Sequence, residues 1–144
     1  RKEAHMLEIP PKLRAVVRRR LKEEYVVWMT TVGSDLAPQP RPVWFIWDHD
    51  SFLIYSQPHA RKVQHLLQHP KVALHFNSDR TADNDVLVFI GEARIDPEAL
   101  PVHKVRAYMK KYRDGIAGLN VTPEQMANEY SVAIRVTPTS VRGL

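Results

Sequence analysis

The spacing of apolar residues along the chain predicts a small, mainly β domain in which helices interrupt the strands. Alternating or β-branched apolar runs predict about six strands, over residues 25–32, 36–47, 52–56, 72–77, 86–95 and 130–138. Apolar residues three or four positions apart predict helices over residues 13–24, after Pro58, and twice after residue 100. Strands of this length with short connections favour an antiparallel barrel over a parallel sheet.

Turn and cap residues sharpen this outline at three positions. Gly33-Ser34-Asp35 follows the first strand and predicts a hairpin. Gly91 lies inside a long strand pattern, where it indicates a bulge or a bend. Thr122-Pro123-Glu124-Gln125 has the residue order of a capping box with proline at the first helical position. The polar stretch at residues 78–85 is predicted to be a loop.

Two helices are predicted from shared apolar faces. The helix after Pro58 is expected to bury Val63, Leu66 and Leu67 together and to end at Pro70. The first helix after residue 100 is expected to carry one continuous stripe and to end at Asp114-Gly115; the stripe consists of Val102, Val105, Met109 and Tyr112.

Three prolines mark one strand as unusual. Pro38, Pro40 and Pro42 alternate along the second predicted strand, so three backbone donors are missing from one of its edges. That edge cannot pair fully with a neighbour. We expect a single domain over residues 6–144, and we set residues 1–5 aside as a remnant or a disordered segment because His5-Met6 resembles a junction before a native start.

Composition narrows the chemistry by exclusion. The 144 residues are 44% hydrophobic and include no cysteine, so disulfides, thiolate metal sites and a cysteine nucleophile are excluded. None of the five glycines forms a dinucleotide-binding, P-loop or nucleophile-elbow motif. No apolar run approaches the roughly 18 residues of a membrane helix. We therefore expect a cytoplasmic protein without a membrane partner.

The charge distribution argues against nucleic acid as a partner. The net charge is +5, but eight of the 21 Lys and Arg residues fall within residues 1–24, and the rest of the chain is nearly neutral. His65 and His69 lie four residues apart on a predicted helix, but two ligands without a third do not make a metal site. We expect neither nucleic acid nor metal.

One segment indicates an anion-binding site. The hydroxyl of Ser56 ends a predicted strand, and the next helix opens with Arg61-Lys62. The first turn of a helix presents unpaired N–H groups and a positive dipole end, which suits a phosphate. Two cations at this position oppose the dipole and are disfavoured without an anionic partner.

The same segment resembles the flavin-binding split-barrel superfamily typified by pyridoxamine 5′-phosphate oxidase. The matching stretches are Arg41-Pro42-Val43-Trp44-Phe45, residues 55–63 (YSQPHARKV) and Pro70-Lys71-Val72-Ala73-Leu74. The tail at residues 130–138 with Val141-Arg142-Gly143 is similar to the deazaflavin-dependent oxidoreductase branch. The resemblance implies a homodimer of six-stranded antiparallel split barrels, with the cofactor in a groove between the subunits.

The resemblance also implies a set of cofactor-binding residues. The first stretch would line the cofactor, the second would lie beside its ring and tail, and the two cations would hold its phosphate; these are Arg41, Pro42, Val43, Trp44, Tyr55, Ser56, Arg61 and Lys62. The chain ends in Ser140-Val141-Arg142-Gly143-Leu144 and lacks the arginine–histidine segment with which the vitamin oxidase grips its substrate. We therefore do not expect pyridoxamine phosphate oxidation.

The implied function is hydride transfer between the deazaflavin F420 (8-hydroxy-5-deazaflavin) and a small electron-poor molecule. The alternatives are an FMN-dependent oxidoreductase and a non-enzymatic flavin or haem-type carrier or sensor on the same barrel. Because the cofactor supplies the reactive ring, no catalytic side chain is required, and we assign none.

Overall fold

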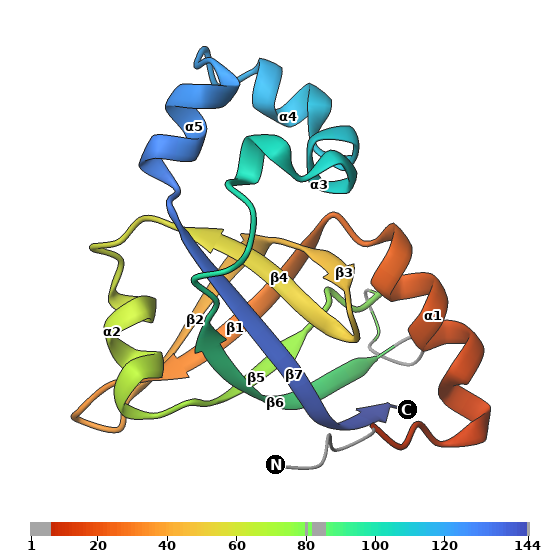
Figure 1. Ribbon diagram of the computed structural model, residues 1–144. Helices are drawn as coiled ribbons and strands as arrows, with labels where there is room; N and C mark the ends of the chain where they lie inside the picture. Colours follow the sequence, from red (N-terminus) through yellow and green to blue (C-terminus); the bar gives the residue numbers. More distant parts are fainter. Residues whose placement is uncertain (1–6, 80, 82–85, 144) are drawn as a thin grey trace.

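A single antiparallel sheet, curled into a half-barrel, forms the centre of the molecule (Figure 1). The computed structural model describes residues 7–79, 81 and 86–143. The strands run in the order β2-β1-β5-β6-β7-β4-β3. Their bounds are β1 Val26–Val32, β2 Pro38–Trp44, β3 Ile46–Asp48, β4 Ser51–Ser56, β5 Lys71–His75, β6 Leu87–Ile95 and β7 Val132–Gly143. The mainly β split-barrel class expected from the sequence is confirmed.

The sheet has seven strands among the described residues rather than the six expected, because one predicted strand is two. Residues 36–47 leave β1 at Trp44 and join the opposite edge of the sheet as β3. Phe45 lies at this corner, and its backbone bonds to side chains rather than to a strand. Its N–H donates to the Tyr112 hydroxyl at 2.8 Å, and its carbonyl accepts from Lys111 at 2.8 Å.

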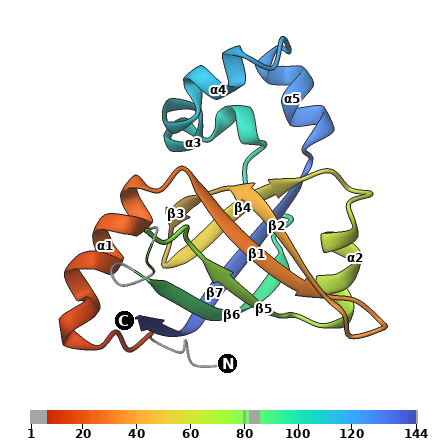
Figure 2. The ribbon, with the colours of Figure 1, turned by 180° about the vertical axis from the view of Figure 1, so that it is seen from behind.

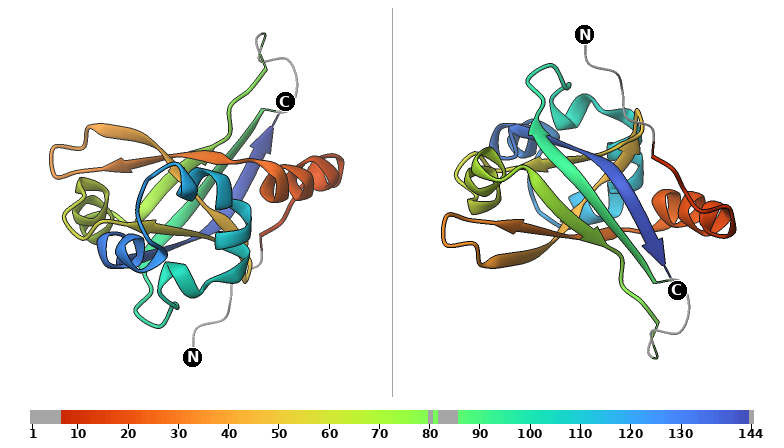
Figure 3. Two further views of the ribbon diagram at one scale, coloured as in Figure 1. Left: turned by 90° about the horizontal axis from the view of Figure 1, so that it is seen from above. Right: turned by 90° about the horizontal axis from the view of Figure 1, so that it is seen from below.

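Helices pack on three sides of the sheet (Figures 2 and 3). Helix α1 (Arg14–Glu23), preceded by η1 (Pro11–Leu13), lies beside β3, and α2 (Arg61–Gln68) lies beside the β1–β2 hairpin. One end of the half-barrel is covered by η2 (Val102–Lys104), α3 (Arg106–Lys111), α4 (Arg113–Ala117) and α5 (Pro123–Glu129). Two apolar clusters result, one inside the curled sheet and one beneath the α3–α5 cover.

Most local predictions are confirmed. The capping box at Thr122 is complete: its hydroxyl accepts from the Gln125 N–H, and the Gln125 side chain accepts from the Thr122 N–H. The β6–β7 register shifts between Ile90 and Gly91, where a Cβ at position 91 would lie 2.7 Å from the Thr137 carbonyl oxygen. Strand β2 is an edge strand, as its prolines require.

Two helix predictions are wrong in detail. Leu67, expected in the core, is 66% exposed, whereas Val63 and Leu66 are buried. The helix expected to continue to Asp114-Gly115 is broken into η2, α3 and α4, and Gly115 lies within α4. A Cβ on Gly115 would approach the Trp44 ring to 2.9 Å, so this glycine permits close packing rather than ending a helix. The predicted loop at 78–85 and the segment 1–5 fall largely or wholly outside the described residues.

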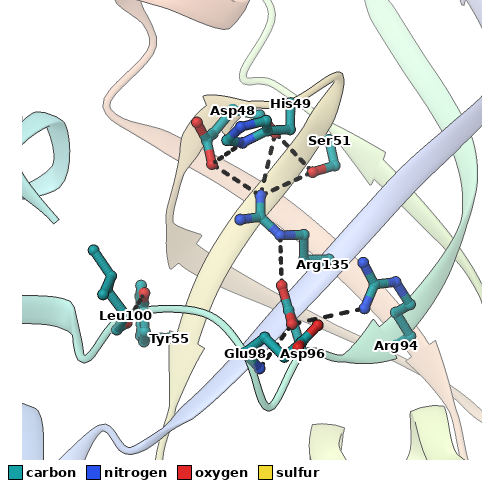
Figure 4. Close-up of polar contacts among 9 residues, drawn as sticks. All are labelled: Asp48, His49, Ser51, Tyr55, Arg94, Asp96, Glu98, Leu100 and Arg135. Atoms are coloured by element: carbon teal, nitrogen blue, oxygen red, sulfur yellow. Dashed lines mark hydrogen bonds and ion pairs between the residues drawn. The ribbon is translucent and has the colours of Figure 1, made fainter.

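An ionic cluster centred on Arg135 ties three elements together (Figure 4). From β7, the Arg135 guanidinium donates to the Asp96 carboxylate at 2.9 Å and contacts the Asp48 carboxylate at 3.1 Å. It also donates to the Asp48 carbonyl and to the Ser51 hydroxyl. Asp48 and Ser51 flank the two-residue turn between β3 and β4, whose central residues both have positive φ although neither is glycine. Arg135 therefore braces a strained hairpin.

Candidate functional site

A small cavity of about 170 Å³ lies between the β1–β2 hairpin and the first turn of α2. Three cations from separate parts of the chain line it: Arg41 of β2, and Arg61 and Lys62 of α2. Thr31, Gln39, Ala60 and His65 complete the wall. We call this cavity the cationic pocket.

Strand register and helix periodicity explain why these side chains meet. Thr31 pairs with Gln39 across the β1–β2 ladder, and paired residues share a face of the sheet. Arg41 is two residues further along β2 and therefore lies on the same face. On α2, His65 lies four residues after Arg61 and three after Lys62, so all three follow one side of the helix.

The pocket concentrates positive charge without a counter-charge. Burial lowers the pKa of the half-buried Lys62 ammonium, and the neighbouring Arg41 lowers it further. Among the described residues, none of the three cations forms an ion pair with a carboxylate. The first turn of α2 contains no acidic residue, and Ala60 at the N-cap offers no side-chain acceptor. An anion bound here would relieve both the mutual repulsion and the uncapped helix end.

The polar wall of the pocket is held in place by one hydrogen bond. Thr31 is 2% exposed, and its hydroxyl lies 3.0 Å from His65 Nδ1. The His65 ring in turn lies against Gly33 in the hairpin turn, where a Cβ would meet Nε2 at 2.8 Å. The absence of a side chain at position 33 therefore lets α2 approach the hairpin closely.

Two of the sequence-predicted site residues lie away from the pocket, beneath the α3–α5 cover. Trp44 stacks on Tyr112 with ring centroids 4.5 Å apart and an interplanar angle of 5°. The Tyr55 hydroxyl donates to the Leu100 carbonyl oxygen at 2.5 Å (Figure 4). The Tyr55 ring packs edge-on against Tyr108. Burial raises the pKa of Tyr55 to about 12. Tyr55 is therefore a poor proton donor near neutral pH.

The other three predicted residues have different environments. The Val43 side chain belongs to the inner core, so only its main chain is available to a ligand. Pro42 is exposed on the open edge of the sheet. Ser56 is buried at the end of β4, where its hydroxyl donates to the Gln57 carbonyl oxygen at 3.0 Å. Of the eight residues, the structure thus gathers Arg41, Arg61 and Lys62 in one cavity, and the cofactor roles of all eight stay predictions.

Sequence reasoning missed Thr31 and Gln39, and considered His65 only as a metal ligand. His65 lies about one helical turn after Arg61 and Lys62, so helix periodicity could have predicted that it lines the same pocket. Thr31 and Gln39 depend on strand register, which has no such local signal. No group of three or more potential metal ligands occurs among the described residues. Within the same residues, no helix is long and apolar enough to cross a membrane.

Together, the curled sheet and its helical cover define a protein of the split-barrel class. Residues 13–144 match the model of the pyridoxamine 5′-phosphate oxidase family, and the chain belongs to that family. No curated protein sequence matches the chain significantly.

Solved structures with the same fold serve different purposes. An F420 reductase is 23% identical, with 93% of this chain and 98% of that chain covered and a TM-score of 0.67. A conserved hypothetical protein from Mycobacterium tuberculosis is 19% identical (99% and 88% covered, TM-score 0.69). HutZ, a heme storage protein from Vibrio cholerae, is 14% identical (91% and 94% covered, TM-score 0.63). At these identities the similarity shows the fold alone.

Proposed function

We propose that this protein is an oxidoreductase that binds F420 and transfers a hydride between this deazaflavin and a small electron-poor organic molecule. The observation that carries the proposal is the cationic pocket, in which Arg41, Arg61 and Lys62 surround a cavity with no carboxylate partner among the described residues. These cations would hold the coenzyme's phosphate. The similarity to an F420 reductase and the tail at residues 130–138 favour the deazaflavin over other flavins.

The chain's own residues would bind and orient rather than react. When bound, a 5-deazaflavin ring supplies a hydride carrier, so the protein need only fix its position and exclude water. Pro42 lies on the exposed edge where β2 has no further strand, which leaves main-chain carbonyls available to a ring. The half-buried Trp44 and the buried Tyr55 would stiffen the structure behind that edge.

FMN is the second candidate cofactor, because it also carries a phosphate that the pocket would accept and because the family is named for an oxidase. A non-enzymatic carrier is the other alternative, favoured by the similarity to a heme storage protein. Both alternatives use the same fold, since a fold does not determine chemistry.

Titrating the purified protein with F420, FMN and heme side by side tests the proposal. We expect saturable F420 binding, followed by oxidation of reduced F420 when enones, quinones or biliverdin-like tetrapyrroles are added. Tighter binding of FMN would support the second candidate. Binding of heme with no turnover of either reduced coenzyme would support a carrier. If none of the three ligands bound, the proposal would be wrong.

We also propose that the protein is a homodimer, with the cofactor groove at the subunit interface. The outward face of β1, β5 and the first half of β6 carries half-buried apolar side chains where an antiparallel sheet facing water is usually polar; these are Trp28, Ala73, Val88 and Ile90. On the second half of β6 and on β7, the same face is exposed and polar, with Glu92, Arg94 and Thr137. The apolar part is the area that a second copy would cover.

Light scattering after gel filtration measures this directly. The wild type is expected to have the mass of two chains, and Ile90→Lys is expected to shift it toward one, because a lysine would place an unpaired charge in the interface. Thr137→Lys, on the polar part of the same face, is the matched control and is expected to stay dimeric. A wild-type protein with the mass of one chain would contradict the dimer.

A further inference from the structure

A second and larger cavity lies between α1, the edge strand β3 and α3. Helix α1 is on the opposite flank of the half-barrel from α2 (Figure 1). The volume of the cavity is about 1500 Å³, and it is open to solvent. It shares no lining residue with the cationic pocket. Small-molecule pockets usually measure about 300–1000 Å³, so this groove has room for a sizeable ligand. We call it the α1–α3 groove.

The floor of the groove is apolar. Val17 and Leu21 of α1 face it and are 1% and 6% exposed. Ile46 and Trp47 of β3 continue the floor, and the Trp47 ring is fixed edge-on against Phe52 at 5.2 Å between centroids. The apolar surface still open to water comes from the half-buried side chains of Trp47 and of Leu7 and Ile9, which line the groove before α1. A hydrocarbon body that covered these side chains would remove that surface from water.

Both rims of the groove are cationic. Five lysine or arginine residues line it against two carboxylates, Glu8 and Asp50; the cations are Arg14, Arg18, Lys22, Lys110 and Lys111. The three on α1 are spaced by four residues, so they follow one side of the helix. Among the described residues, none of the five forms an ion pair.

The Lys111 ammonium in the groove wall lies in an environment that disfavours its charge. It donates to the Phe45 carbonyl oxygen at 2.8 Å and lies 3.8 Å from the centroid of the Phe45 ring. Burial lowers the pKa of Lys111 to about 8, although Glu24 opposes the shift. Its nearest partners are thus a carbonyl oxygen and the rings of Phe45 and Tyr112, and Glu24 forms no ion pair with it among the described residues. A ligand carboxylate at this rim would add a direct counter-charge.

We propose that the α1–α3 groove binds a free long-chain carboxylate, with its hydrocarbon chain on Leu7, Ile9 and Trp47 and its head at the cationic rims. The cations are spread along two helices instead of converging on one point, which suits a monoanionic head more than a compact dianion. A membrane surface is the less favoured anion, because the apolar side chains of α1 are buried in the floor and cannot enter a bilayer. The site is independent of the proposed oxidoreductase function.

Dodecanoate, kept below its micelle-forming concentration, is the probe, and isothermal calorimetry is the measurement. We expect one saturable site per chain for dodecanoate and no saturable binding of dodecyltrimethylammonium, which has the same tail and the opposite charge. The fluorescence of Trp47 should change with the same midpoint, and the Trp47→Phe variant should lose that change while still binding.

Arg18→Glu tests the rim. Reversing this exposed charge is expected to weaken dodecanoate binding about tenfold, since an exposed charge pair contributes up to roughly 1 kcal/mol and reversal also adds repulsion. Lys12→Glu changes the net charge equally, but Lys12 is exposed on η1 outside the groove, and we expect less than about a twofold effect. Both residues are exposed, so both variants should fold, and coenzyme titrations should be unchanged.

Three outcomes would overturn the proposal. In the first, dodecanoate does not bind at all. In the second, both variants weaken binding equally, which would reveal a response to net charge alone. In the third outcome, the protein binds vesicles of anionic phospholipid while ignoring monomeric dodecanoate, which would assign the groove to a membrane surface.

Discussion

Arg135→Met is expected to lower the free energy of unfolding by about 3 kcal/mol, because the substitution leaves two aspartates without their cation. The Arg135 and Asp96 side chains are 13% and 12% exposed, so the Asp96 carboxylate is not simply rehydrated in place. The value lies at the low end for a buried pair because Asp48 is more exposed than Asp96. The strained turn between β3 and β4 would also lose the guanidinium that bonds to the Asp48 carbonyl.

The effect of this substitution should depend on pH in a defined direction. The hydrogen bond from Arg135 holds the pKa of Asp96 below its ordinary 3.8. Burial opposes ionisation of Asp48, but hydrogen bonds from His49 and Arg135 outweigh it, so its pKa is also lowered. A lowered carboxyl pKa stabilises the fold above the ordinary value, and this stability is lost as the pH falls through the folded-state pKa.

Urea unfolding at pH 7 and at about pH 3 measures both effects. The wild type should lose more stability than Arg135→Met between the two conditions, so the difference between them should shrink in acid. Arg94→Met is the matched control: Arg94 is 63% exposed and 3.9 Å from Asp96, and its loss should cost less than about 1 kcal/mol. Equal effects of the two substitutions at pH 7 would show that the Arg135 cluster does not brace the hairpin.

Arg61→Ala and Lys62→Ala are each expected to weaken coenzyme binding by about 1.5–3 kcal/mol, the scale of a hydrogen bond to a charged group. This corresponds to roughly 10- to 150-fold in Kd. The coenzyme-free Lys62→Ala protein should not be less stable through charge effects, because burial and Arg41 both disfavour the ammonium. Weaker binding without a matching loss of stability would distinguish a phosphate contact from a structural role.

Titration with F420 and with FMN provides the binding constants, and thermal unfolding without coenzyme provides the stability. Lys12→Ala removes an exposed cation that is distant in sequence from the cationic pocket, and it should leave both coenzyme affinities unchanged. Unchanged titration midpoints for both pocket variants would show that the coenzyme's phosphate does not bind in the cationic pocket.

Features encoded by a few adjacent residues were predictable from the sequence. The capping box at Thr122, the bulge at Gly91 and the unpaired edge at Pro38–Pro42 each follow from one local rule, and the structure contains all three. The charge conflict at Arg61-Lys62 also indicated an anion site from helix electrostatics alone. The structure adds the third cation, Arg41, which the resemblance had placed along the cofactor.

Features created by long-range packing were not predictable in this way. The stripe after residue 100 looks continuous, but the Tyr112 hydroxyl lies within 2.8 Å of backbone atoms of both Tyr25 and Phe45, and the helix is broken around it. Leu67 has the spacing of a core residue, yet α2 turns its polar side toward the hairpin so that His65 reaches Thr31. Arg135 forms its ion pairs only because β7 passes between Asp48 and Asp96, which are distant from it in sequence.

The proline-rich border of β2 also determines how the protein can meet other chains. Because Pro38, Pro40 and Pro42 cannot donate from the backbone, an incoming strand would find acceptors without matching donors. Growth of the sheet by strand addition, the usual beginning of fibrous aggregation, is therefore blocked on this side. A partner that binds at this border must therefore contact side chains or donate hydrogen bonds to the main-chain carbonyl oxygens.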